Sequence, residues 1–195
     1  MSGEIRDGWA RQAAIEARQV DDAWERIETW LHRNAPATAA LLRPGATDDE
    51  LAAFERELGV RIPAGLKALW RRCPGMTAVD GVGADFLLGR WAPMTFDAVL
   101  ETYRMQMGMR VTMDEYVSWR PSWIPFASFG AHDTLYGLCL DAETGKIWKW
   151  TEIAERTLVH PSLSVYLEDM ADALDLPDLT PGAPPRVREG ALVWA

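Results

Sequence analysis

The strongest constraint on the fold is a pair of short apolar runs that a compact turn joins in the second half of the chain. Residues 135–140 and 146–150 have the length and composition of strands, and the five residues 141–145 between them read DAETG. A glycine near the end of such a short connection is typical of a β-hairpin. The sequence therefore predicts two neighbouring strands joined by a tight turn at this point.

A second local pattern predicts two helices upstream of the hairpin. Thr47 followed three residues later by Glu50 forms a capping box, which marks the start of a helix. The positions that follow place apolar residues on one helical face: Leu51, Phe54 and Leu58. Gly59 is a natural C-terminal stop for this helix, and Pro63 can open the next one.

The remaining patterns complete the expected element order. We expect a helix at residues 4–33, in two pieces, another after Thr95, and a last one after Ser162. Residues 123–129 form a strand that Pro125 interrupts, which suits an edge strand or a bulge. Helices, then a hairpin-rich sheet, then a helix predict an α+β fold, with helices packed on a central, mainly antiparallel sheet.

The length of 195 residues is typical of one domain with additions at its ends. We expect residues 1–23 to form an N-terminal helical extension and residues 24–176 to form the domain itself. Residues 177–195 are a tail rich in proline and glycine. The tail ends in an apolar run at 191–194, which either adds a final strand or docks onto the body.

The net charge of −9 bears on the kind of partner that the protein can have. An acidic surface repels DNA, RNA and anionic lipid and attracts basic proteins. The same charge can serve solubility alone, and the composition does not separate these two interpretations. Within residues 152–178, Arg156 is the only arginine or lysine beside seven acidic residues: Glu152, Glu155, Glu168, Asp169, Asp172, Asp175 and Asp178.

The cysteines and the hydropathy pattern favour a reducing, aqueous compartment. Cys73 and Cys139 stand far apart and outside any Cys-x-x-Cys motif, so we expect two buried free thiols. No apolar stretch reaches the roughly 18 residues that a membrane helix needs. The first residues are charged and lack the apolar core of a signal peptide, so we expect a cytoplasmic protein.

Motifs of the common enzyme classes are incomplete in this chain. The GVG run at 81–83 lacks the lysine of a phosphate-binding loop, and Phe86 stands where a dinucleotide fingerprint needs glycine. His132 and Asp133 are adjacent on extended backbone, point apart and have no identifiable nucleophile. Asp141 suits a turn better than a metal site. We therefore predict no catalytic, cofactor-binding or metal-binding residue, and no enzyme.

Several of these motifs together resemble the SUKH (Smi–Knr) superfamily. The resemblance covers about residues 24–176 and rests on the order and spacing of fragments that are individually weak. These fragments are LRPGATDDEL at 42–51, FERELGVRIP at 54–63, WIPFA at 123–127, LCLD at 138–141, the return strand at 145–150 and the closing helix at 162–174.

The resemblance implies an α+β fold with a central sheet and a role in binding another protein. Bacterial members of the superfamily are immunity proteins that neutralise polymorphic toxins, often nucleases, and fungal members are scaffold regulators of cell-wall synthesis and signalling. We hypothesise an immunity protein, with a regulatory or scaffold protein without a toxin partner as the alternative. The resemblance carries no catalytic residues, and the sequence indicates no oligomeric state.

On the first hypothesis, acidic and aromatic residues in loops contact a basic partner protein, because many nuclease toxins are basic. The residues that we predict for this contact are Asp80, Asp85, Asp114, Glu115 and Trp119. A nearby run of methionines is either an adaptable binding surface or core filler beneath a loop. This run consists of Met105, Met107, Met109 and Met113.

Overall fold

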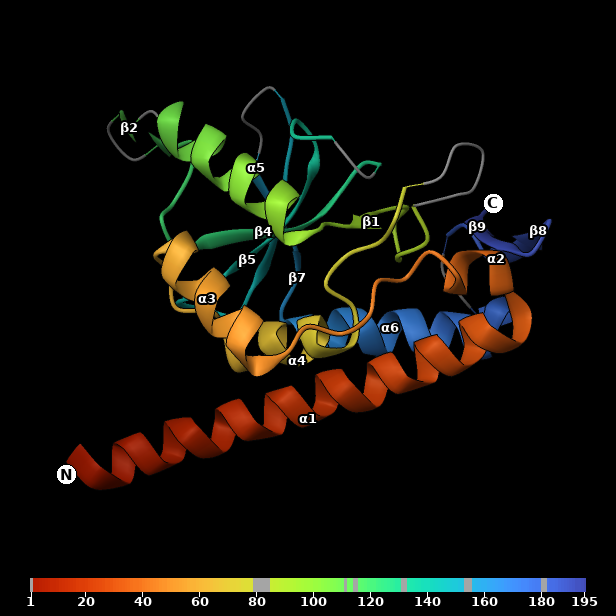
Figure 1. The fold of residues 1–195 in the computed structure, drawn as a ribbon, viewed down its shortest axis with the longest axis horizontal. Coiled ribbons are helices and arrows are strands. Elements are labelled where there is room, and N and C mark those ends of the chain that lie inside the picture. Colours follow the sequence, from red (N-terminus) through yellow and green to blue (C-terminus); the bar gives the residue numbers. More distant parts are fainter. Residues whose placement is uncertain are drawn as a thin grey trace.

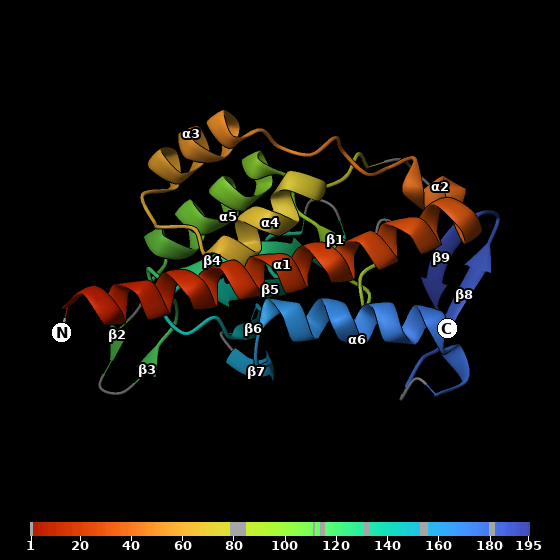
Figure 2. The same cartoon turned by 90° about the horizontal axis from the view of Figure 1, so that it is seen from below.

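An antiparallel sheet lies at the centre of the molecule, with helices packed on it (Figures 1 and 2). The computed structural model describes residues 2–78, 85–110, 112–113, 116–130, 133–152, 156–179 and 182–195. Among these residues, the sheet has five strands in the order β1-β4-β5-β6-β7. The fold is therefore α+β, as the sequence predicts.

The bounds of the elements follow the chain. The helices are α1 (Ser2–Asn34), α2 (Pro36–Ala39), α3 (Asp48–Leu58), α4 (Ala64–Arg72), α5 (Phe96–Gly108), α6 (Leu163–Asp175) and the short 3-10 helix η1 (Pro177–Leu179). The sheet strands are β1 (Ala92–Pro93), β4 (Trp123–Ser128), β5 (Gly137–Asp141), β6 (Ile147–Trp150) and β7 (Arg156–His160). Two further antiparallel pairs are β2 (Thr112–Met113) with β3 (Tyr116–Val117), and β8 (Pro185–Arg188) with β9 (Ala191–Trp194).

The predicted hairpin is confirmed as β5 and β6, which pair antiparallel. The Asp141 carboxylate holds the turn, since its Oδ1 accepts the Glu143 N–H at 3.1 Å and its Oδ2 accepts the Thr144 hydroxyl at 2.8 Å. Gly145 closes the turn with a φ of 73°, in the left-handed region that glycine adopts most easily. Asp141 therefore acts as a turn residue, as predicted.

The predicted helix ends are also confirmed. The Thr47 hydroxyl accepts the Glu50 N–H at 3.2 Å, and the Glu50 carboxylate accepts the Thr47 N–H at 2.7 Å, so the capping box at the start of α3 is complete. Gly59 ends α3 in the left-handed conformation. The Thr95 and Ser162 hydroxyls cap α5 and α6 by accepting the N–H groups of Ala98 at 3.3 Å and Val165 at 3.2 Å.

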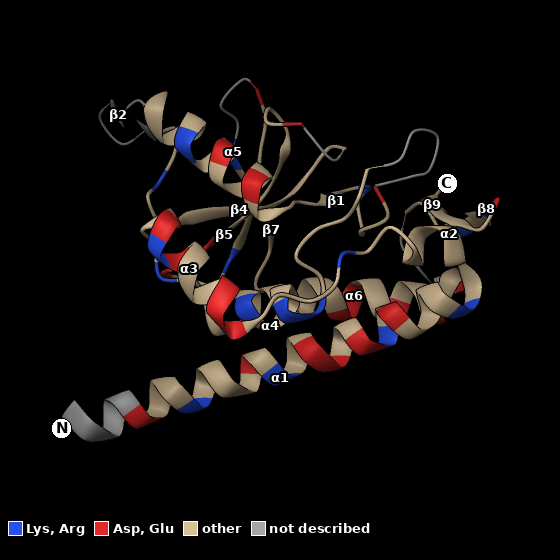
Figure 3. Ribbon diagram, viewed as in Figure 1, with Lys and Arg blue, Asp and Glu red and all other residues tan. Residues whose placement is uncertain are grey.

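The N-terminal helix differs from the prediction, because α1 is one continuous element rather than two pieces. Its buried residues recur at helical spacing without a proline to break them: Val20, Ala23, Trp24, Ile27 and Leu31. Acidic and basic residues occur along the helix (Figure 3). Arg26 bonds Asp172 at 2.8 Å and Asp175 at 2.6 Å, and these bonds join α1 to α6.

Residues 86–88 join three distant parts of the chain. The Phe86 ring packs edge-on against Trp24 of α1, with centroids 6.4 Å apart. The Tyr166 hydroxyl of α6 donates to the Leu88 carbonyl oxygen at 2.8 Å. The Trp194 indole N–H of β9 donates to the Phe86 carbonyl oxygen at 2.8 Å. The C-terminal hairpin therefore docks onto the body.

Four tryptophans gather around β4 and β6. The Trp119 ring packs edge-on against Trp123 and Trp150, with centroids 5.6 Å apart in both pairs. Trp148 stacks on Trp123 at 5.7 Å. Gly137 of β5 lies opposite Trp150, and a Cβ at this position would collide with the Trp150 ring and the Ala127 carbonyl oxygen. The cluster therefore needs glycine at this position of β5.

Other strand predictions are only partly right. Pro125 stands at a bulge, as one of the two alternatives predicts, but β4 is not an edge strand because it lies between β1 and β5. β7 and the β2–β3 pair were not predicted, because they are short segments without clear alternation. α2 was not predicted either, because it is a single helical turn.

We predict that Gly137→Ala destabilises the protein by about 1–3 kcal/mol, the usual range for overpacking a core. The midpoint of urea unfolding measures this effect. Gly8→Ala is the matched control, since no atom lies within 4 Å of the added Cβ and alanine favours a helix. Equal midpoints for Gly137→Ala and the wild-type protein would contradict the close contact with Trp150.

Candidate protein-docking surface

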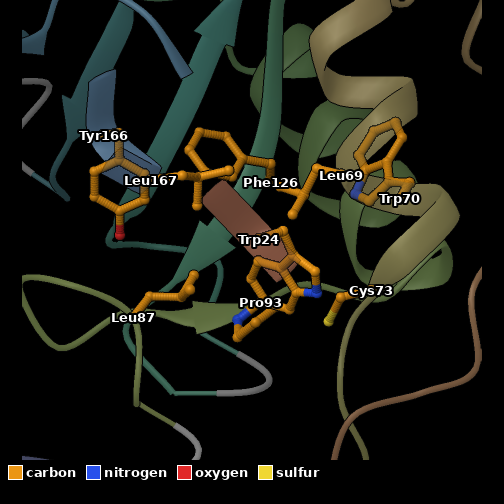
Figure 4. Close-up of a pocket in the computed structure, with 9 residues that line it drawn as sticks. All are labelled: Trp24, Leu69, Trp70, Cys73, Leu87, Pro93, Phe126, Tyr166 and Leu167. Carbon is orange, nitrogen blue, oxygen red and sulfur yellow. The ribbon is translucent and has the colours of Figure 1, made fainter. Parts of the chain in front are cut away.

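A small cavity lies in the described part of the interior. A cavity of about 10 Å³ lies between α1, α4, α6 and the sheet, and its lining includes Trp24, Cys73, Phe126 and Tyr166 (Figure 4). This volume is close to that of a single water molecule, so the cavity cannot hold a metabolite. Within the described ranges, no group of three His, Cys, Asp or Glu side chains could hold a metal ion.

Both cysteines are buried free thiols, as predicted. Burial raises the pKa of the Cys73 thiol to about 12, and it raises the pKa of Cys139 as well. Both groups therefore remain protonated at neutral pH, and neither is a reactive nucleophile. No described helix is both long enough and apolar enough to cross a membrane.

The connection between β4 and β5 carries three exposed large apolar side chains among its described residues: Phe129, Leu135 and Tyr136. The Asp133 Oδ1 accepts the N–H groups of Leu135 at 2.7 Å and Tyr136 at 3.3 Å. The Phe129 N–H donates to the Tyr136 carbonyl oxygen at 3.0 Å, which continues the strand pairing one residue beyond Ser128. These bonds anchor the described parts of the connection to a rigid sheet.

Aromatic side chains come together at this connection. Phe129 and Tyr136 lie on the same side of the sheet because they are opposite one another, and their exposed fractions are 55% and 38%. Leu135 beside them is also exposed. The half-buried Trp91 ring meets the Phe129 ring edge-on, with centroids 6.5 Å apart. Exposed aromatic side chains held on rigid backbone are typical anchors of protein interfaces.

Acidic groups accompany these rings. The Tyr136 hydroxyl donates to the Glu152 carboxylate at 3.2 Å. This hydrogen bond raises the pKa of Tyr136, and the charges of Glu152 and Asp133 raise it further. The two carboxylates therefore place negative charge near the tip of the Tyr136 side chain. Asp85 precedes the turn at 88–90 that leads to Trp91, and its carboxylate pairs with Arg90 of that turn at 3.5 Å.

We call this region the aromatic–acidic surface. It consists of Trp91, Phe129, Leu135 and Tyr136, with Asp85, Asp133 and Glu152 beside them. The aromatic members were not predicted from the sequence, because local pattern does not tell an exposed strand-end aromatic from a buried one. The only available signal was the glycine-containing loop that follows Phe129.

Of the predicted partner-binding residues, the structure describes Asp85 and Trp119. Asp85 lies at the aromatic–acidic surface and stays a predicted contact. Asp80, Asp114 and Glu115 lie outside the described residues. The prediction that Trp119 contacts a partner is corrected by the structure. Its side chain is fully buried between Trp123 and Trp150, so no partner can reach the ring from the surface. Its position in the core follows from the loop folding back onto β4 and β6.

The methionines of the predicted run lie in different environments in the structure. α5 extends to Gly108 and includes Met105 and Met107, and Met107 packs against the core. Met109 is exposed beyond the helix end. The side chain of Met113 lies outside the described part of the structure. One methionine is thus core filler, and another is available at the surface.

Comparison with known proteins identifies the family. Residues 45–169 match the model of the SMI1 / KNR4 family (SUKH-1). The chain belongs to this family. The match includes the whole five-stranded sheet and the aromatic–acidic surface, while α1, α2 and the β8–β9 hairpin lie outside it.

Part of a larger plant protein is similar to this chain. The F-box protein SKIP16 of Arabidopsis thaliana is 28% identical to this chain over 103 residues, which are 51% of this chain and 24% of that protein. The chain thus matches about a quarter of the length of this relative. The shared part is small enough that the functions of the whole plant protein do not transfer.

We predict that Glu152→Gln lowers the pKa of Tyr136 towards its ordinary value. A neighbouring negative charge disfavours the phenolate, so removing the charge makes the hydroxyl easier to ionise. NMR titration of tyrosine-labelled protein measures the shift. Glu143→Gln, in the turn at the opposite end of β5, is the control and should leave Tyr136 unchanged. An unchanged pKa in Glu152→Gln would contradict the described contact.

Proposed function

We propose that this SUKH-family chain binds another protein through the aromatic–acidic surface and thereby neutralises a polymorphic toxin. The observation that carries the proposal is the exposure of Phe129 and Tyr136 on rigid strand ends beside the Glu152 carboxylate. The family supports protein binding as the general activity. Direct toxin binding is the specific form that we propose, and it requires no catalytic step.

The physical case rests on how interfaces gain affinity. A few buried aromatic side chains supply most of the binding energy of an interface, and surrounding contacts exclude water. Trp91, Phe129 and Tyr136 can provide such a centre. Acidic groups at the rim, together with the net charge of −9, attract a basic partner and speed its association. A nuclease toxin has such a basic surface, because it must hold phosphate groups.

A regulatory or scaffold role without a toxin is the second candidate. The match to a plant F-box protein supports it, because there the similar segment is one part of a longer chain. In this case the same surface would bind a partner in cell-wall synthesis or signalling. The two candidates share the docking surface and differ in the identity of the partner and the consequence of binding.

We predict that replacing Phe129 and Tyr136 together by alanine weakens partner binding by at least about 30-fold, the equivalent of about 2 kcal/mol. The wild-type protein and the double variant are immobilised, and the proteins that each one captures from native lysate are compared at low and high salt. The affinity for the captured protein is then measured with purified components. Ile15→Ala, an exposed apolar residue on α1, is the matched control.

The proposal requires that the wild type and the Ile15→Ala control both capture a basic protein. The double variant should not retain this protein, and high salt should release it from the wild type. Equal retention by the double variant would exclude the aromatic–acidic surface. Growth of cells that co-express the captured protein then separates the candidates. Toxicity that the wild type suppresses supports immunity, whereas a harmless cell-wall or signalling protein supports the scaffold role.

A further inference from the structure

The indole N–H group of Trp24 is buried without a protein acceptor. Trp24 lies on α1 and is 1% exposed. Within the part of the chain that the structure describes, no group accepts a hydrogen bond from its Nε1 atom. Such a donor loses the hydrogen bond that it makes to water in the unfolded chain, which costs free energy, and buried donors in folded proteins almost always have a partner. The Trp24 N–H group therefore needs an acceptor.

The position of Trp24 distinguishes it from other buried tryptophans. Trp194, for example, has an acceptor, since its indole N–H donates to the Phe86 carbonyl oxygen at 2.8 Å. Three members of the tryptophan cluster also have an Nε1 atom without a described acceptor, but they do not line the small cavity: Trp119, Trp123 and Trp148. Trp24 combines an unpaired donor with a place in the cavity wall.

Cys73, at the end of α4, supplies a second polar group to the cavity wall. Its thiol donates to the Gly75 carbonyl oxygen at 3.3 Å, so the thiol proton is engaged there and the sulfur lone pairs remain as weak acceptors. Burial raises the pKa of this thiol to about 12, so it stays protonated at neutral pH. Figure 4 shows the indole nitrogen of Trp24 on the side of its ring that faces Cys73. A donor and an acceptor thus line the same cavity.

The size and the remaining wall of the cavity decide what it can hold. A volume of about 10 Å³ is room for about one water molecule. The rest of the wall is mainly apolar and includes Leu69, Phe126 and Leu167. The Tyr166 hydroxyl, also from the wall, already donates to the Leu88 carbonyl oxygen at 2.8 Å. A purely apolar cavity stays dry, whereas a water molecule is favoured where it meets polar partners.

We propose that this cavity is a site for one structural water molecule, which accepts the Trp24 indole N–H and donates to the Cys73 sulfur. A water in such a place satisfies a buried donor, and many ordered waters cost little entropy to immobilise. The water also joins α1 to the end of α4. Cys73 lies inside the segment 45–169 that matches the family, and Trp24 lies outside it. The site therefore fastens an added helix to the family domain, and it does not depend on the proposed function.

Two measurements on the wild-type protein test the site. A high-resolution crystal structure should show density for one water molecule at about 2.7–3.2 Å from the Trp24 Nε1 atom. In solution, the Trp24 indole proton, assigned by triple-resonance NMR, should show a cross-relaxation peak to the water resonance. Trp119 is the matched control, because its Nε1 atom is also buried and unpaired among the described residues but does not line the cavity. Its indole proton should show no such peak.

Substitutions at Cys73 test the second contact. Cys73→Val replaces the sulfur by two methyl groups that fill the cavity, so the density and the cross-relaxation peak should both be lost. Cys73→Ser keeps a polar group at the same place and should retain both. A dry cavity in the wild type, a Trp24 N–H that points at an aromatic ring, or water retained in Cys73→Val would overturn the proposal. Circular dichroism verifies that both variants are folded, and the wild-type measurements decide alone if Cys73→Val is not.

Discussion

The convergence of three aromatic side chains on residues 86–88 supports the rest of the structure. Trp24 from the N-terminal helix, Tyr166 from the last long helix and Trp194 from the final strand all meet this short segment. Two of the contacts are hydrogen bonds to the Leu88 and Phe86 carbonyl groups, which give these groups partners away from bulk water. Helices and hairpin from both ends of the chain are thereby held against one sheet.

This arrangement divides the molecule into a covered side and an open end. α1, α4 and α6 cover one face of the sheet around Phe126, and the small cavity among them leaves no room for a ligand. The tryptophan cluster fills space around β4 and β6. The β4–β5 connection presents Phe129 and Tyr136, which are both exposed, at the paired ends of the two strands.

Local signals in the sequence were sufficient wherever neighbouring residues decide the conformation. The Thr47–Glu50 capping box, the Asp141 turn and the Ser162 cap each depend on hydrogen bonds within a few residues. Prediction failed where distant contacts decide. β7 becomes a strand by pairing with β6, and Trp119 is buried because its loop folds onto two strands. Exposure of Phe129 and Tyr136 likewise depends on which residues surround them in space.

The sequence by itself determined the element order, the antiparallel hairpin, the helix ends and the SUKH family, because these rest on local periodicity, turn chemistry and motif spacing. Tertiary structure alone decided which aromatic side chains reach the surface. Trp119 and Phe129 are both large aromatic residues near opposite ends of β4, yet one is buried and the other is exposed. Burial is a property of the packed whole, since a side chain is removed from water only by elements that the chain brings from elsewhere.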